Sequence, residues 1–191
     1  ASDVYKRQMM MVADQLRVGL LTEHVPLAEV PAMVTVAAIG DKLRLMTSSL
    51  IRDFGVERPR IAVLGLNPHA GDGGLLGREE METILPAIEA ACEEGVHAFG
   101  PFPADGFFAI GMYRNYDGVL AMYHDQGLIP FKTLAFSTGV NYTAGLPIIR
   151  TSPDHGTAFN IAGKGEADPG SMRSAVFLAL DIVRRRMRAA T

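Results

Sequence analysis

Short apolar runs alternate along the chain with longer stretches in which apolar residues recur every three or four positions. The short runs predict β-strands, because each is only a few residues long and is bounded by Gly, Pro, Asn or Asp. The predicted strands are 16–21, 61–66, 118–123 and 142–149. The longer stretches predict helices at 42–54, 78–94, 126–136 and 171–188.

The last predicted helix, 171–188, has the clearest amphipathic pattern. The spacing places one set of apolar residues on a single helical face: Met172, Val176, Ala179, Leu180, Val183 and Met187. We expect that face to pack inward. Strands that alternate with helices of this length predict an α/β fold, with a mostly parallel sheet flanked by helices and active groups at the carboxyl ends of the strands.

Composition narrows the class of protein without identifying a function. The chain has 191 residues, 48% hydrophobic and 20% charged, as expected for a soluble globular protein of one large domain, or of one domain plus part of another. A net charge of −3 provides no basic surface for nucleic acid. No apolar stretch approaches the roughly 20 residues that span a bilayer. The single cysteine, Cys92, lies in a helical pattern, so we expect it in the core of a cytoplasmic protein.

The beginning of the chain has an unusual sequence. It does not start with Met, and its first eight residues lead abruptly into the apolar run 9–12. We therefore set residues 1–8 apart as a candidate foreign segment and base the predicted fold on residues 9–191.

Three of the five histidines share one sequence context. His24, His69 and His124 each follow a predicted strand and open a turn-rich loop. In a parallel sheet their imidazoles would emerge at the same edge. Three imidazoles with an open position suit a catalytic divalent metal, with zinc the best match by ligand type and Asp105 or Asp125 as an added oxygen ligand. The alternative is that each histidine caps its own loop or acts separately in acid–base chemistry.

The other two histidines have different contexts. His97, in GVHAFGP, does not follow a predicted strand, and we interpret it as structural. His155 lies in SPDHGTAFNIAGKG, where Gly and small residues would let the backbone approach a ligand. An ordinary surface loop would also use such residues.

Several segments together resemble one known family: LNPHAGDGG, GPFPAD, AMYHDQG, GVNYTAGLPIIRTSPDHGTA and IAGKG. This is the 4-hydroxythreonine-4-phosphate dehydrogenase family of vitamin B6 biosynthesis, and the likeness runs from about Met9 to the C-terminus. It implies an isocitrate/isopropylmalate dehydrogenase-like α/β fold and a homodimer whose active site lies between subunits. It also implies NAD(P)-dependent oxidation of the C3 hydroxyl of a small phosphorylated substrate, followed by decarboxylation to 3-amino-2-oxopropyl phosphate.

The resemblance also implies roles for individual residues. The family's metal ligands match His24, His69 and His124, the same three that follow predicted strands, for Zn, Mg or Co. Its substrate-contacting residues match Lys132, Asn141 and Arg150, whose two cations and amide suit a phosphate and a carboxylate. The general base is unassigned, and Asp105 and Asp125 are its candidates, although acids beside a metal also orient its histidines.

The cofactor loop is implied by likeness to the adenosine-binding loop of isopropylmalate and isocitrate dehydrogenases. The residues that match it are His155, Gly156, Thr157, Ala158, Asn160 and Ile161. NAD-using members of that wider group carry a carboxylate near the middle of this loop, where the present chain has Asn160. The choice between NAD and NADP therefore stays open.

The chain also departs from the family. Members carry roughly another domain's worth of residues before the point where this chain begins, including a His-Thr pair that contacts substrate. We therefore expect residues 9–191 to be the C-terminal portion of the dehydrogenase, with the N-terminal part of the fold missing. A smaller departure is Glu23, which precedes His24 where relatives often have Thr.

Three alternatives to this dehydrogenase stay open. The chain would be a paralogue acting on another phosphorylated four-carbon acid or on a dihydrodiol, a metal-dependent hydrolase, or an inactive metal-binding fragment. A hydrolase would need the three histidines but neither His155 nor a nicotinamide cofactor. A substrate panel, cofactor binding and size in solution distinguish these alternatives.

Overall fold

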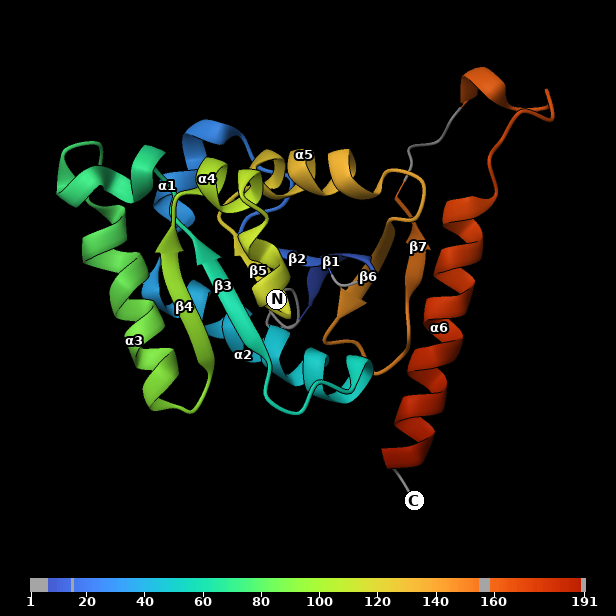
Figure 1. The fold of residues 1–191 in the computed structure, drawn as a ribbon, viewed down its shortest axis with the longest axis horizontal. Coiled ribbons are helices and arrows are strands. Elements are labelled where there is room, and N and C mark those ends of the chain that lie inside the picture. The colour runs from blue at the N-terminus through green and yellow to red at the C-terminus, as the bar shows by residue number, and fades with distance from the viewer. Residues whose placement is uncertain (1–6, 15, 155–158, 190–191) are drawn as a thin grey trace.

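The computed structural model describes residues 7–14, 16–154 and 159–189, and within them lies one seven-stranded sheet (Figure 1). Its strand order is β4-β3-β5-β2-β1-β6-β7. The strands are β1 (Gln8–Ala13), β2 (Leu16–Leu20), β3 (Arg60–Leu64), β4 (His97–Phe102), β5 (Gly118–Ala121), β6 (Val140–Ala144) and β7 (Thr151–Pro153). Strands β4, β3, β5 and β2 pair in parallel, whereas β1 pairs antiparallel with β2 and β6, and β6 with β7. Only β1 and β7 run against the common direction, which confirms the mostly parallel sheet.

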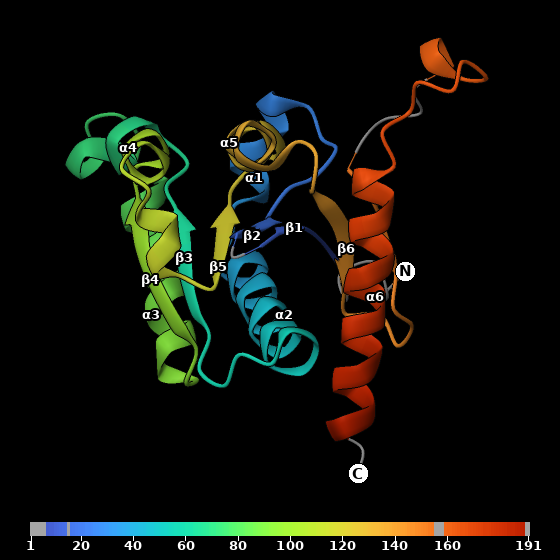
Figure 2. The same ribbon diagram turned by 45° about the vertical axis from the view of Figure 1, so that its right-hand side comes forward.

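Helices cover both faces of this sheet. The longer helices are α2 (Val36–Phe54), α3 (Leu85–Glu93), α5 (His124–Ala135) and α6 (Gly170–Ala189). One core cluster joins α2, α3 and Ile182 of α6 to one face, and a second joins α5 and α4 (Ala104–Ala109) to the other. Figure 2 shows α6 beside the β6 and β7 edge. In the described ranges, no helix is both long and apolar enough to cross a membrane.

Short helical turns connect these elements. They are η2 (Leu27–Glu29), α1 (Val30–Met33), η3 (Pro68–Gly74), η4 (Glu80–Ile84), η5 (Met112–Asn115) and η6 (Phe159–Ile161). Several lie where the chain leaves the carboxyl end of a strand. They therefore form the loops in which active groups were expected.

The sequence explains the central elements. In β3, Ile61 and Val63 face one core cluster while Ala62 and Leu64 face the other. A strand buried on both faces is a continuous apolar run, as seen here. Helix α2 begins after Thr35, whose hydroxyl accepts a hydrogen bond from the Ala38 amide at 3.2 Å. It ends at Gly55, whose φ of 70° is left-handed and therefore favours glycine.

The predicted elements are confirmed where the hydrophobic pattern was strong. All four predicted strands and four predicted helices are present, with shifted ends. The strand predicted at 142–149 ends at Ala144, because Gly145 adopts a φ of 81° and turns the chain. Strands β1, β4 and β7 and helix α4 were not predicted. Gln8, in the segment set apart as foreign, is the first residue of β1 and is fully buried.

Two packing predictions were wrong. The apolar face of α6 is exposed rather than buried: Met172, Val176, Leu180, Val183 and Met187 are 39–67% exposed. The buried residues of α6 are Ser171, Ala175 and Ile182, because the helix packs beside the edge of the sheet through a different, narrow strip. Cys92 is also exposed instead of lying in the core. It lies near the end of α3, where its thiol donates to the Ala98 carbonyl of the edge strand β4 at 3.4 Å, whereas Ile88 and Ala91 are buried.

Candidate functional site

Two histidines are brought together by backbone pairing between β2 and β5. The pairing continues beyond both strands, because the amides of Leu21 and Thr22 donate to the carbonyls of Ala121 and Met122. The Thr22 hydroxyl also donates to the Met122 carbonyl, at 2.8 Å. His24 and His124 each follow this pairing by two residues, and their ring centroids lie 5.3 Å apart.

His69 reaches the same edge of the sheet from β3, which neighbours β5 on its other side. It lies in η3, where residues 69–73 all have positive φ, so this loop is held in a left-handed conformation. The buried carboxylate of Glu80 supports the loop: it accepts hydrogen bonds from the Asn67 amide at 2.7 Å and from Asn67 Nδ2 at 2.9 Å. A carboxylate below the loop therefore positions the backbone that carries His69.

The predicted strand-end placement of all three histidines is confirmed, but they do not form one ligand set within the chain. Among residues 7–14, 16–154 and 159–189, no three His, Cys, Asp or Glu side chains are grouped to hold a metal ion. His24 and His124 line one cavity of about 330 Å³. His69 lines another, of about 300 Å³, with Asp105 and Gln126. Tyr123 borders both cavities.

A third cavity, of about 420 Å³, connects His24 to two of the predicted substrate residues. We call it the anion pocket, and its lining includes Arg7, Glu23, His24, Asn141, Thr143 and Arg150. The buried Oδ1 atom of Asn141 has no hydrogen-bond partner among the described residues. Arg150 is exposed and donates from Nη1 to the Thr143 hydroxyl at 2.8 Å. The pocket therefore offers a guanidinium and an unsatisfied amide oxygen beside an imidazole.

Glu23 borders both the histidine cavity and the anion pocket. Its carboxylate accepts a hydrogen bond from the Met9 amide at 3.1 Å and lies 3.8 Å from Lys42 Nζ. Burial lowers the pKa of Lys42, and the charge of Glu23 opposes that shift. Glu23 thus ties β1 and α2 to the loop that carries His24.

The remaining predicted residues lie in several places. Lys132 is 3.4 Å from an Asp154 carboxylate oxygen and is not part of the anion-pocket lining. Asp125 is exposed and lies 2.8 Å from Nδ1 of His124, a position that orients that ring. Asp105 is on the first turn of α4, beside His69 in the cavity described above.

The predicted cofactor loop is only partly described. His155, Gly156, Thr157 and Ala158 lie outside the described residues, and Asn160 and Ile161 form part of η6. This turn projects away from the sheet, beyond the start of α6 (Figure 1).

Sequence reasoning missed three polar residues that organise the site: Thr22, Glu80 and Gln126. Gln126 accepts a hydrogen bond from the Met122 amide and donates to the Gly65 carbonyl, both at 2.7 Å. It therefore joins the ends of β5 and β3. Their position in the sequence could have identified them, because each residue lies within a few residues of a strand end or on the helix that follows.

This arrangement defines an α/β protein of the isocitrate/isopropylmalate dehydrogenase-like class, with histidines and an anion pocket at the ends of its strands. The family model "Pyridoxal phosphate biosynthetic protein PdxA" matches residues 2–179. The chain belongs to the PdxA family.

Known relatives agree with this assignment. The chain is 54% identical over 183 residues to 4-hydroxythreonine-4-phosphate dehydrogenase of Bacteroides thetaiotaomicron, an alignment that covers 96% of this chain and 50% of the relative. The crystal structure of the Klebsiella pneumoniae dehydrogenase of that name matches with a TM-score of 0.82 and 44% identity, over 93% of this chain and 54% of the other. The chain thus spans about half the length of the relatives it matches.

A relative with a different name is also similar in structure. A terephthalate 1,2-cis-dihydrodiol dehydrogenase from Burkholderia xenovorans matches with a TM-score of 0.74 and 29% identity, over 93% of this chain and 56% of the other. Relatives of both names are dehydrogenases.

Proposed function

We propose that the chain carries the metal- and substrate-binding part of a 4-hydroxythreonine-4-phosphate dehydrogenase. The reaction is NAD(P)-dependent oxidation of the C3 hydroxyl, followed by decarboxylation to 3-amino-2-oxopropyl phosphate in pyridoxine 5′-phosphate biosynthesis. The observation that carries this proposal is the His24 and His124 pair beside the anion pocket, where Asn141 Oδ1 is unsatisfied and Arg150 is exposed. The names of the relatives support the substrate.

In this proposal His24 and His124 hold a divalent metal, with zinc favoured by ligand type and Mg or Co as alternatives. Their rings are near enough to share one ion. The third ligand is His69 of a second copy of the chain, so the metal site lies between the two subunits of a homodimer. The exposed apolar residues Leu75 and Leu76, which follow the His69 loop, support contact between copies there. When bound, the metal polarises the substrate oxygen that is oxidised.

The side chains of the anion pocket bind and orient the substrate. Arg150 is suited to bidentate contact with a phosphate or carboxylate. Asn141 Oδ1 accepts a hydrogen bond from a substrate hydroxyl or ammonium group, which satisfies an otherwise unpaired buried atom. Lys132 adds a second cation, after exchanging its contact with Asp154 for the substrate.

The loop 155–161 holds NAD or NADP, which accepts the hydride. Asp125 orients His124, and Asp105 is the candidate that removes the hydroxyl proton, because it faces the cavity that also contains His69. The lone Cys92 suits a reducing cytoplasmic setting.

Metal and substrate binding test this function directly. We would titrate the chain with Co²⁺ by absorption and with 4-hydroxythreonine 4-phosphate by calorimetry, and measure NAD(P)H formation. His24→Ala is expected to abolish metal binding, and Arg150→Met to weaken substrate binding about tenfold or more. His97→Ala is the matched control, because His97 is exposed on β4. A wild-type chain that binds no metal contradicts the proposal, whereas metal and substrate binding without NAD(P)H formation identifies an inactive binding fragment.

A second candidate is oxidation of a dihydrodiol, which the similarity to the Burkholderia xenovorans enzyme favours. A terephthalate-derived dihydrodiol carries carboxylates in place of the phosphate, so Arg150 can bind either substrate. Turnover of that dihydrodiol by the wild-type chain, without turnover of 4-hydroxythreonine 4-phosphate, would select this second reaction.

A further inference from the structure

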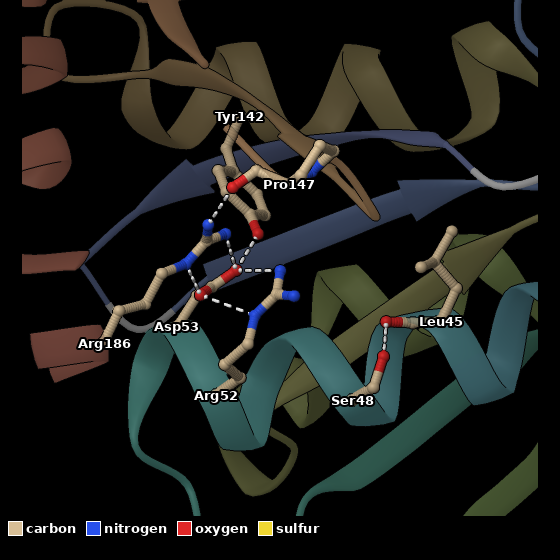
Figure 3. A network of polar contacts seen from close by, with 7 residues as sticks. All are labelled: Leu45, Ser48, Arg52, Asp53, Tyr142, Pro147 and Arg186. Carbon is tan, nitrogen blue, oxygen red and sulfur yellow. Dashed lines mark hydrogen bonds and ion pairs between the residues drawn. The ribbon is translucent and has the colours of Figure 1, made fainter. Parts of the chain in front are cut away.

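Asp53, at the end of α2, is the centre of a polar network that joins three parts of the fold (Figure 3). Its carboxylate side chain is fully buried. Arg186 of α6 donates to it from Nε at 2.7 Å and from Nη2 at 3.0 Å. The neighbouring Arg52 donates from Nε at 3.0 Å and from Nη2 at 2.9 Å, and the Tyr142 hydroxyl of β6 donates as well.

The groups around Asp53 favour its ionised form. Burial disfavours the charged form of Asp53, but hydrogen bonds from Arg186, Arg52 and Tyr142 outweigh it and hold the pKa of this carboxyl well below its usual range. Burial and the bond to Asp53 together raise the pKa of Tyr142 to about 12. Near neutral pH, α2, β6 and α6 are therefore joined through one anion.

Arg186 makes one more contact, outside this network of charges. Its Nη1 donates to the carbonyl of Pro147 at 2.9 Å. Pro147 lies in the loop from Gly145 to Arg150 that connects β6 to β7. The guanidinium thus holds both Asp53 and the loop that ends at the arginine of the anion pocket.

The anion pocket lies on the opposite face of β6 from this network. Asn141 and Thr143, the neighbours of Tyr142 on β6, line the pocket. Because successive side chains of a strand point to opposite faces, Tyr142 points to the other face, toward Asp53. The end of the loop is paired back to the strand, since the Thr143 amide donates to the Arg150 carbonyl at 3.0 Å. The strand and the loop that supply the pocket's polar groups are therefore both tied to Asp53 and Arg186.

We infer that Asp53 and Arg186 are positioning residues for the anion pocket: through Tyr142 and Pro147 they fix the strand and loop that carry Asn141, Thr143 and Arg150. This inference rests on the proposed function only for the role of the pocket. It places control of that pocket on the last helix of the chain, far from the histidines in sequence. A network that served only to attach α6 would leave the loop and its anion affinity unchanged when the contact with Pro147 alone is removed.

Arg186→Lys separates these two roles. An ammonium keeps a charge beside Asp53, but it lacks the planar fork that reaches Asp53 and Pro147 together. The matched control is Arg184→Lys, because Arg184 is exposed and pairs with Asp181 on the same helix. Hydrogen exchange measured by mass spectrometry on segment 143–151 reports the loop, and titration with inorganic phosphate reports the pocket. Thermal melting reports the attachment of α6.

Relative to Arg184→Lys, we expect Arg186→Lys to raise exchange in segment 143–151 and to weaken phosphate binding, each about tenfold. The weakened contact with Asp53 should also lower the melting temperature, with smaller increases of exchange in α2 and α6 than in segment 143–151. Unchanged exchange in that segment would overturn the inference, as would an increase shared equally by α2 and α6. Asp53→Asn provides a second test, with the same loop expected to exchange fastest. If the wild-type chain binds phosphate no better than Arg150→Met does, the proposed pocket fails, while the exchange of segment 143–151 still decides the positioning role.

Discussion

Two edges of the candidate site are built in different ways. At the histidine edge, the ends of β2 and β5 continue the sheet's own hydrogen bonds up to Thr22 and Met122, so the backbone places His24 and His124. At the anion-pocket edge β6 also pairs with β1 and β7 through its backbone, but side chains additionally join β6 and the loop that follows it to α2 and α6. Asp53 and Arg186, which make these contacts, are 133 residues apart in sequence. A site placed by backbone pairing should tolerate single substitutions, whereas one held by a buried ion network should lose much of its order when one member changes.

The largest effect is expected from Asp53→Asn. It leaves two guanidiniums and the Tyr142 hydroxyl around a neutral amide, and removing one partner of a buried ion pair costs about 3–5 kcal/mol. The free energy of unfolding, measured by urea denaturation, should fall by an amount in that range. Asp181→Asn is the control, because Asp181 is exposed and forms an ion pair with Arg184 at 3.4 Å on the surface of α6. Equal stability of the two variants would contradict the comparison of the two edges.

The same carboxylate gives a pH test with a defined sign. Because the pKa of Asp53 is lower in the folded chain than in the unfolded chain, its contribution is complete above the unfolded value of about 4. It is lost as the pH falls below that value toward the folded pKa. The difference in stability between the wild type and Asp53→Asn should therefore shrink in acid. A difference that stays constant from neutral pH to pH 2 would mean that Asp53 is not ionised in the fold.

The next largest effect concerns the two sides of α6. Ile182 is fully buried, so Ile182→Ala should lower the free energy of unfolding by about 2–4 kcal/mol. Leu180, which belongs to the stronger apolar pattern, is 45% exposed, so Leu180→Ala should change it by less than about 0.5 kcal/mol. Urea denaturation of the pair measures both. Similar losses would mean that the apolar face is covered in solution.

The α6 result shows what a hydrophobic pattern can and cannot predict. Periodicity identified the helix and its apolar face, but it contains no information about which face meets the sheet. The buried strands and the strand-end histidines were predictable from the local sequence. A continuous apolar run indicates a buried strand, and parallel strands bring the residues that follow them to one edge of the sheet. Strands β4 and β7 were missed because β4 contains Gly100 and Pro101 and β7 has only three residues.

The anion pocket shows a second limit of sequence reasoning. Asn141 and Arg150 came from resemblance to a family, since each in isolation resembles a turn or surface residue. The network of Asp53 and Arg186 that lies behind them has no local sequence signal, because its partners come from distant segments. Nothing in the sequence indicated that His69 lies apart from the other two histidines. The position of His69 depends on the left-handed loop and on Glu80, which no strand pattern predicts.

A smaller effect is expected from Glu80→Gln, which tests whether the His69 loop is held by side chains. The amide can still accept a hydrogen bond from the Asn67 backbone, but its NH₂ group would face the Asn67 Nδ2 donor. This leaves a buried polar group unsatisfied, at a cost of about 1–3 kcal/mol. Glu82→Gln is the control, because Glu82 is exposed and pairs with Arg78. Thermal melting measures stability, and proteolysis between residues 67 and 77 measures loop order. If cleavage does not increase over the control, Glu80 does not hold the His69 loop.

The smallest effect is expected from Thr22→Val at the histidine edge. The substitution removes the hydroxyl that donates to the Met122 carbonyl, but that carbonyl still accepts a hydrogen bond from the Thr22 amide at 3.2 Å. The loss should be about 0.5–1.5 kcal/mol, the net value of one hydrogen bond. Because backbone pairing persists, His24 and His124 should stay together, and Co²⁺ affinity should change by less than about threefold. A loss of Co²⁺ binding as complete as that expected for His24→Ala would show that the Thr22 side chain, rather than the sheet backbone, positions the pair. The two edges of the site would then depend on side chains in the same way.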